Sequence, residues 1–205
     1  MVQVLPQKKL VTFEEFTQWK PEGGRYELHN GVIIQMSQPS GEHEDIIGFL
    51  GLEISFDIKR LNLPYYISKT ALVKPPESES GYSPDILVIN RPNLVNEPLW
   101  KKQSTVIQGG SIPLVVEVVN TNWRDDYLTK VRDYEIIGIG EYWIIDYLGL
   151  GGVRYIGSPK QPTISIYYLV ENEYRVSQFR GNERIISPTF PELNLTANQV
   201  FQAGS

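Results

Sequence analysis

Hydrophobic positions recur with two different periods along the chain, and the two periods separate predicted helices from predicted strands. Between residues 40 and 60 the apolar positions follow a spacing of three or four, which is that of one helix face. That stripe consists of Ile47, Leu50, Ile54 and Ile58. Residues 84–89 and 114–119 are instead continuous runs of Val, Ile and Leu broken by one acid, which is typical of buried strands. We therefore expect buried strands covered by helices.

Capping and turn signals place further elements. Thr12 followed three residues later by Glu15 predicts a short helix with a capping box. Asn30-Gly31 predicts a tight turn between strands 26–28 and 32–34. Residues 124–137 read as a helix ended by Gly138, and residues 90–111 as irregular. Further strands are predicted at 65–73, 141–147, 153–156, 164–169 and 174–179, followed by a short helix capped by Thr196.

This order of elements predicts one α/β domain over residues 1–205, in which a mixed central sheet is flanked by helices and extended by antiparallel strands over 141–180. The chain has no cysteine, which excludes disulfides, thiolate zinc sites and a cysteine nucleophile. We expect a cytoplasmic protein, because residues 1–11 contain no signal peptide or membrane span. The net charge of −5 counts mildly against tight non-specific DNA binding, although a local basic groove remains compatible with it.

Each of the two most apolar runs contains a single acidic residue. Asp85 opens the first run directly after Pro84, and Glu117 lies inside the second. A carboxylate among Val, Ile and Leu is costly unless a partner compensates it. In one reading each acid caps a loop or pairs with an arginine. In the other, both acids lie on neighbouring strands and form a site for a hard divalent cation.

Asp126 and Lys130 are one helical turn apart on the helix that follows Glu117. At the protein surface such a pair is worth only about 0.3–0.5 kcal/mol. Alternatively, Lys130 reaches back over the end of the Glu117 strand, where it orients a water or offsets charge on a phosphorane-like transition state. In that case we expect its loss to reduce the reaction rate and to change stability little.

These motifs together resemble the family of proposed restriction endonucleases known as Uma-two, within the PD-(D/E)XK nuclease superfamily. The matching segments are Pro84-Asp85, Glu117-Val118-Val119, Asp126 to Lys130, Glu141 to Asp146, and parts of 12–43 and 193–196. The resemblance implies a restriction-endonuclease-like fold in which Asp85, Glu117 and the backbone carbonyl of Val118 bind Mg²⁺ or Mn²⁺. The superfamily places its lysine at position 119, which is valine here, so Lys130 takes that role.

The resemblance further implies Mg²⁺-dependent hydrolysis of DNA by a possible homodimer, and it brings Glu27 near the catalytic residues. The alternative that Glu27 is an ordinary acid at the edge of the hairpin, without a role in the site, stays open. His43 is expected to cap its helix, with a contact to the scissile phosphate as the alternative. Two other functions remain: a scaffold with the same fold but no activity, and a nuclease that acts on RNA or on a particular nucleic-acid structure.

Overall fold

A six-stranded mixed sheet forms the centre of the protein, as a computed structural model describes it for residues 10–21 and 23–204. The strand order is β10-β9-β8-β7-β5-β3. Only β7 and β8 are parallel, and every other neighbouring pair is antiparallel. The strands are β3 (Tyr65–Ser68), β5 (Ile86–Asn90), β7 (Leu114–Val118), β8 (Glu141–Asp146), β9 (Thr163–Val170) and β10 (Glu173–Phe179). The predicted mixed sheet and its antiparallel extension are therefore confirmed.

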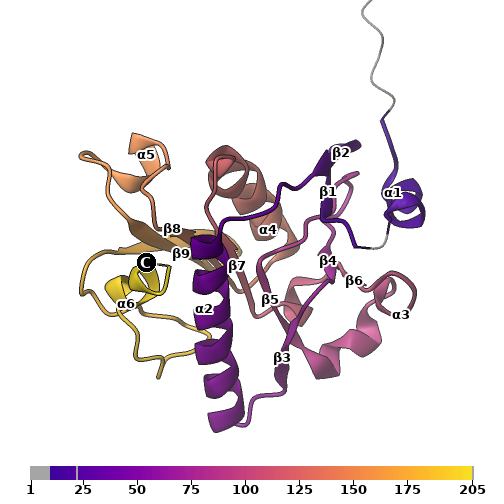
Figure 1. The fold of residues 1–205 in the computed structure, drawn as a ribbon. Coiled ribbons are helices and arrows are strands. Elements are labelled where there is room, and N and C mark those ends of the chain that lie inside the picture. The colour runs from indigo at the N-terminus through magenta and orange to yellow at the C-terminus, as the bar shows by residue number, and fades with distance from the viewer. Residues whose placement is uncertain (1–9, 22, 205) are drawn as a thin grey trace, which may run out of the picture.

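Helices cover both faces of this sheet (Figure 1). One face carries α2 (Gly41–Arg60) and α6 (Ala197–Gln202), and the other carries α4 (Val131–Ile137). Two small sheets lie beside it: the hairpin of β1 (Tyr26–His29) and β2 (Val32–Gln35), and the pair β4 (Leu72–Val73) and β6 (Thr105–Val106). Further helices are α1 (Phe13–Trp19), α3 (Trp100–Gln103), α5 (Val153–Ile156) and the 3₁₀ helices η1 (Arg91–Asn96) and η2 (Gly109–Ser111).

The alternation of side chains along β7 separates the two larger hydrophobic cores, one on each face of the central sheet. Val116 and Val118 pack with α2 and α6, whereas Val115 and Val119 pack on the side of α4. Because residues two apart share a face, Glu117 lies between Val115 and Val119 on the side of α4. A helix on that face can therefore bring a side chain to Glu117.

Helix starts that were predicted from a capping residue are confirmed. Thr12 and Glu15 form the capping box of α1, and Thr196 caps α6. The strand predicted at 153–156 is wrong, because this segment is the short helix α5, whose first residue Val153 is exposed. The predicted strand 65–73 is interrupted after Ser68 and forms β3 and β4. The segment predicted to be irregular contains η1, α3, β6 and η2.

The predicted helix 124–137 begins with a widened turn. Residues 125–130 form the π-helix η3 (Asp125–Lys130), which continues directly into α4. At the other end Gly138 closes α4 with a φ of 81°. A Cβ at Gly109 would lie 2.1 Å from the carbonyl oxygen of Gly138, so the end of α4 is in close backbone contact with η2. Among the described residues, no helix combines the length and apolar character needed to cross a membrane.

Candidate active site

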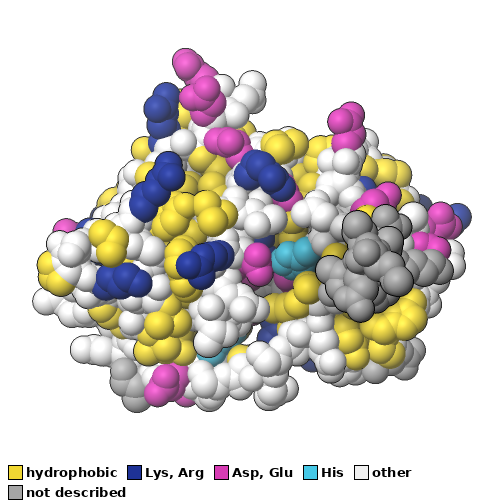
Figure 2. Space-filling view, turned by 90° about the horizontal axis from the view of Figure 1, so that it is seen from above, with side chains coloured by type: hydrophobic (Ala, Val, Ile, Leu, Met, Phe, Trp, Pro, Cys, Tyr) yellow, Lys and Arg dark blue, Asp and Glu magenta, His cyan; other side chains and the backbone are white. Residues whose placement is uncertain are grey.

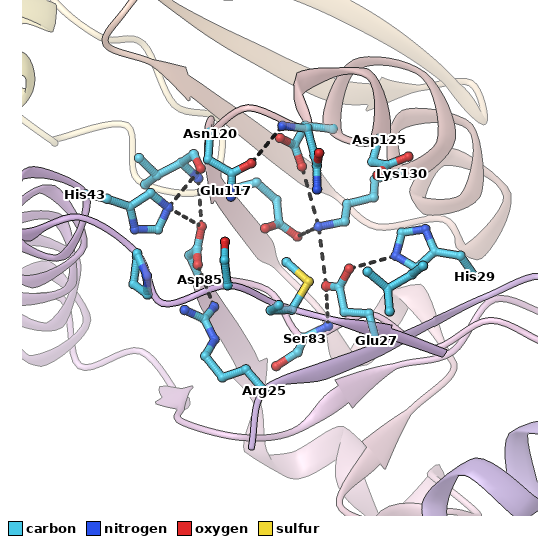
Figure 3. A pocket seen from close by; sticks show the side chains of 17 residues that line it. Arg25, Glu27, His29, His43, Ser83, Asp85, Glu117, Asn120, Asp125 and Lys130 are labelled. Carbon is cyan, nitrogen blue, oxygen red and sulfur yellow. Dashed lines mark hydrogen bonds and ion pairs between the residues drawn. The ribbon is translucent and has the colours of Figure 1, made fainter. Parts of the chain in front are cut away.

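Asp85 and Glu117 come together at the end of two neighbouring strands. Asp85 directly precedes β5, Glu117 lies in β7, and the two strands pair with Ile86 opposite Val116. Their side chains are 7% and 6% exposed, and both line one pocket together with Val118 (Figure 3). The expectation of two acids on adjacent buried strands is confirmed as geometry.

Lys130 enters the same pocket from the end of η3. Its side chain is only 3% exposed, and its Nζ lies 2.9 Å from Glu117 Oε1 and 3.5 Å from Asp126 Oδ1. A third carboxylate, that of Glu27, has its Oε1 3.4 Å from the same Nζ. The surface ion pair is therefore a wrong reading of Asp126 and Lys130. Instead, the buried ammonium of Lys130 forms ion pairs with three buried carboxylates.

Glu27 is held in this cluster by β1 and by two further donors. His29 Nε2 donates to its Oε2 at 2.8 Å, and the backbone N–H of Ser83 donates to its Oε1 at 2.9 Å. Burial would raise the pKa of Glu27, but the Lys130 ammonium and His29 bring that pKa below its ordinary value. Glu27 therefore belongs to the cluster and is not a solvated hairpin acid.

The cluster contains more acid than base. Burial raises the pKa of Glu117 well above its ordinary value, and the neighbouring carboxylates add to the effect. Burial likewise raises the pKa of Asp126 to about 7. Burial opposes the charge of Lys130, but the carboxylates of Glu117, Glu27 and Asp126 raise its pKa well above the usual value. The lysine stays protonated, and an additional cation would favour the ionised form of the crowded carboxyl groups whose pKa values are raised.

Asp85 has a separate set of partners. Arg25 Nη2 lies 3.0 Å from its Oδ1, and the N–H of Val118 donates to its Oδ2 at 2.9 Å. His43 Nε2 is 3.5 Å from Oδ2 and donates to the carbonyl oxygen of Val118 at 3.0 Å. Burial would raise the pKa of Asp85, but His43, the Val118 N–H and Lys130 lower it. Asp85 is thus held as a carboxylate.

Two of these partners were not predicted from the sequence. Arg25 follows two glycines in a polar stretch with no periodic signal. His43 was expected to cap its helix, but the side chain of Ser40 accepts the His43 N–H at 3.3 Å and is the cap. The imidazole of His43 is therefore free to reach β7. That arrangement follows from the packing of α2 on the sheet, which the sequence does not specify.

The pocket is small and its donors suit a hard cation. Its volume is about 30 Å³, which accommodates one or two particles the size of water. Asp85, Glu117 and the Val118 carbonyl present only oxygen atoms, the ligands that Mg²⁺ takes, usually with one or two carboxylates and several waters. No group of three His, Cys, Asp or Glu side chains within the described ranges could hold a metal ion. Two carboxylates and a carbonyl therefore fit magnesium better than a closed zinc site.

The fold and this cluster define an α/β protein whose mixed sheet positions buried carboxylates around one lysine, and comparisons with known proteins show its family. Residues 13–198 match the Uma2 (Uma-two) family model, described as "Putative restriction endonuclease". The chain therefore belongs to the Uma2 family, as the resemblance had indicated. No curated protein matches it.

A solved structure shows the same fold. It is described as the crystal structure of a putative nuclease belonging to DUF820 from Anabaena variabilis ATCC 29413. It superposes with a TM-score of 0.72 at 18% sequence identity, over 95% of this chain and 99% of that one.

Proposed function

We propose that this protein is a Mg²⁺-dependent endonuclease that hydrolyses phosphodiester bonds in DNA. The observation that carries the proposal is the buried Lys130 ammonium 2.9 Å from Glu117, on the strand adjacent to Asp85. Such a cluster costs folding free energy, which a purely structural role leaves unexplained. Membership in a family of this description supports the reaction class.

Asp85, Glu117 and the carbonyl oxygen of Val118 would hold the ion. When bound, a divalent cation lowers the pKa of a coordinated water and stabilises the charge on the leaving oxygen. The Val118 carbonyl oxygen accepts a hydrogen bond from His43 Nε2 at 3.0 Å, and its second lone pair could coordinate the ion. Asp85 is already ionised and aimed at the pocket by Arg25 and the Val118 N–H.

Lys130 would orient the attacking water or donate to the phosphate oxygens as they gain charge. An ammonium has three N–H donors, and three carboxylates lie within 3.5 Å of this one. A contact with substrate therefore requires one carboxylate to turn away. Glu117 is the expected one because it also faces the ion, while Glu27 and Asp126 keep Lys130 in place.

Cleavage of supercoiled plasmid in Mg²⁺ or Mn²⁺ tests the reaction. We expect Glu117→Gln, which removes a charge at nearly constant shape, to slow cleavage at least a hundredfold, or about 2.7 kcal/mol of transition-state stabilisation. Titration calorimetry should show weaker Mn²⁺ binding by the same variant. Glu141→Gln is the matched control, because it removes a buried carboxylate on β8 that does not line the pocket.

Equal Mn²⁺ affinity of wild type and Glu117→Gln would remove Glu117 from the metal site. If wild type cleaves RNA but not DNA, the proposed phosphodiester hydrolysis stands and the proposed substrate becomes RNA. Wild type that cleaves neither would favour the scaffold function. A homodimer, which would place two sites on the two strands of a duplex, stays a prediction from the resemblance.

A further inference from the structure

Two further hollows continue outward from the pocket of Asp85. The first has a volume of about 430 Å³ and shares Arg25, Ser83 and Asp85 with that pocket. The second, of about 470 Å³, shares Lys20 and Thr70 with the first. Because neighbouring hollows share lining residues, they lie side by side in a series that begins at the Asp85 carboxylate. We call it the basic groove.

Positive charge lines this groove although the chain as a whole carries a net charge of −5. Its cations are Lys20, Arg25, Lys69 and Lys102, and its acids are Glu44 and Asp85. Asp85 is neutralised by Arg25. Within the part of the chain that the structure describes, no salt bridge involves the other three cations.

The surroundings of these lysines suit a phosphate backbone. Lys20 is half-buried, and this burial lowers its pKa, so a bound anion would compensate a charge that water solvates incompletely. The groove also presents the hydroxyl and amide side chains of Thr17, Gln38 and Thr70. Such groups, together with lysine, make most of the phosphate contacts in complexes with DNA.

We propose that the basic groove binds the phosphate backbone of the nucleic-acid strand on one side of the scissile bond, through Lys20, Lys69 and Lys102. The inference rests on the proposed nuclease function and specifies where its substrate lies. The pocket itself is too small for a nucleotide and is lined by more acidic than basic side chains, so it cannot supply the affinity for a polyanion. Cations spread along a groove match a chain of phosphates better than one free phosphate.

Fluorescence anisotropy tests this with labelled oligonucleotides, single-stranded and duplex, in EDTA so that no metal-dependent cleavage occurs. The groove variant is Lys20→Gln with Lys69→Gln and Lys102→Gln. The control is Lys59→Gln with Arg154→Gln and Lys160→Gln, exposed positions outside the groove. Two of these lie on or just after α5, on the side of the upper face where Lys and Arg side chains gather (Figure 2).

Each phosphate contact contributes about 0.9 to the slope of log K against log salt for duplex and about 0.7 for single strands. The groove variant should therefore lose about 2.7 or 2.1 from that slope. Over the decade from 1 M to 0.1 M salt this equals a loss of roughly 500-fold or 100-fold in affinity. The corresponding Lys→Arg variant should bind like wild type, which separates charge from packing.

An unchanged salt slope in the groove variant, or an equal loss of slope in the control variant, would refute nucleic-acid binding by the basic groove. In that case plasmid cleavage by wild type would still support the proposed nuclease function. A larger loss in the control would move the binding surface to the side of α5. No binding of either oligonucleotide by wild type also overturns the groove, and the cleavage assay then decides separately on the proposed function. The form of nucleic acid bound is the one whose slope falls by its full expected amount, about 2.7 for duplex or about 2.1 for single strands.

Discussion

Replacing Lys130 by methionine should destabilise the protein by about 3–5 kcal/mol near pH 8. Methionine keeps most of the aliphatic length, so the change isolates the charge. The lost ammonium lies within 3.5 Å of Glu117, Glu27 and Asp126, and it is only 3% exposed. Removing one partner of such a buried group leaves uncompensated charge, which costs about that much. A surface ion pair would cost only about 0.3–0.5 kcal/mol.

The cost should depend on pH in a defined direction. Burial raises the pKa of Glu117 and Asp126 in the folded protein, the latter to about 7, while in the unfolded chain carboxyl groups titrate near 4. Acids with a raised folded-state pKa bind more protons when folded, so the stability is lost as the pH rises through that pKa. Lys130 lowers both of these pKa values, so its loss raises them further. The variant should therefore recover part of the stability lost relative to wild type when the pH falls from about 8 to about 5.

Urea unfolding at both pH values measures the effect, with the linear slope compared to confirm two-state behaviour. Lys59→Met, on the exposed end of α2, is the control and should change the free energy of unfolding by less than about 0.5 kcal/mol. A cost below about 1 kcal/mol for Lys130→Met at pH 8 would refute the buried cluster. The expectation that Lys130 affects rate but not stability is thus revised, and cleavage by its variants must be corrected for the folded fraction.

Two other substitutions test the surrounding electrostatics and the C-terminal segment. Asp126→Asn removes the group whose pKa is about 7. As the pH rises from about 4 to about 7, the free energy of unfolding of this variant should increase relative to that of wild type by up to about 1.4 kcal/mol per pH unit. A difference between the two proteins that stays constant with pH in urea unfolding would contradict this. Glu141 accepts hydrogen bonds from Trp143 Nε1 at 2.6 Å, Ser187 Oγ at 3.0 Å and the Thr189 N–H at 2.8 Å. Glu141→Gln should therefore cost about 1.5–3 kcal/mol and speed limited proteolysis near residue 187, and unchanged stability would show that the carboxylate does not anchor this segment.

The sequence predicted correctly those features that depend on residues within a single strand or turn. Asp85 and Glu117 stood out because an acid within an apolar run needs a reason, and the two runs are indeed neighbouring strands. The Asn30-Gly31 turn and the caps at Thr12 and Thr196 are equally local signals.

The rest depends on tertiary packing. The sequence allowed Lys130 to be either exposed or buried, because the outcome depends on how α4 lies on the sheet. Arg25 and His43 reach Asp85 from segments 60 and 42 residues away in the sequence. The strand predicted at 153–156 failed because four residues cannot distinguish the two periods, and Ile156 packs into the core from a helix as readily as from a strand.

Lys130 lies on a helix and not on the strand of Glu117, and this affects which parts of the site can change in sequence. Glu117 is fixed by β7 and Lys130 by η3, and the loop 120–122 lies between β7 and the helical turn that precedes η3. Asn120 and Asn122 of this loop line the pocket, but neither belongs to a hydrophobic core. Loops of this kind tolerate changes in sequence and length better than the elements they join. The charged residues of the cluster are thus separate from the loop residues that border them, so this loop can change in sequence without rebuilding the cluster.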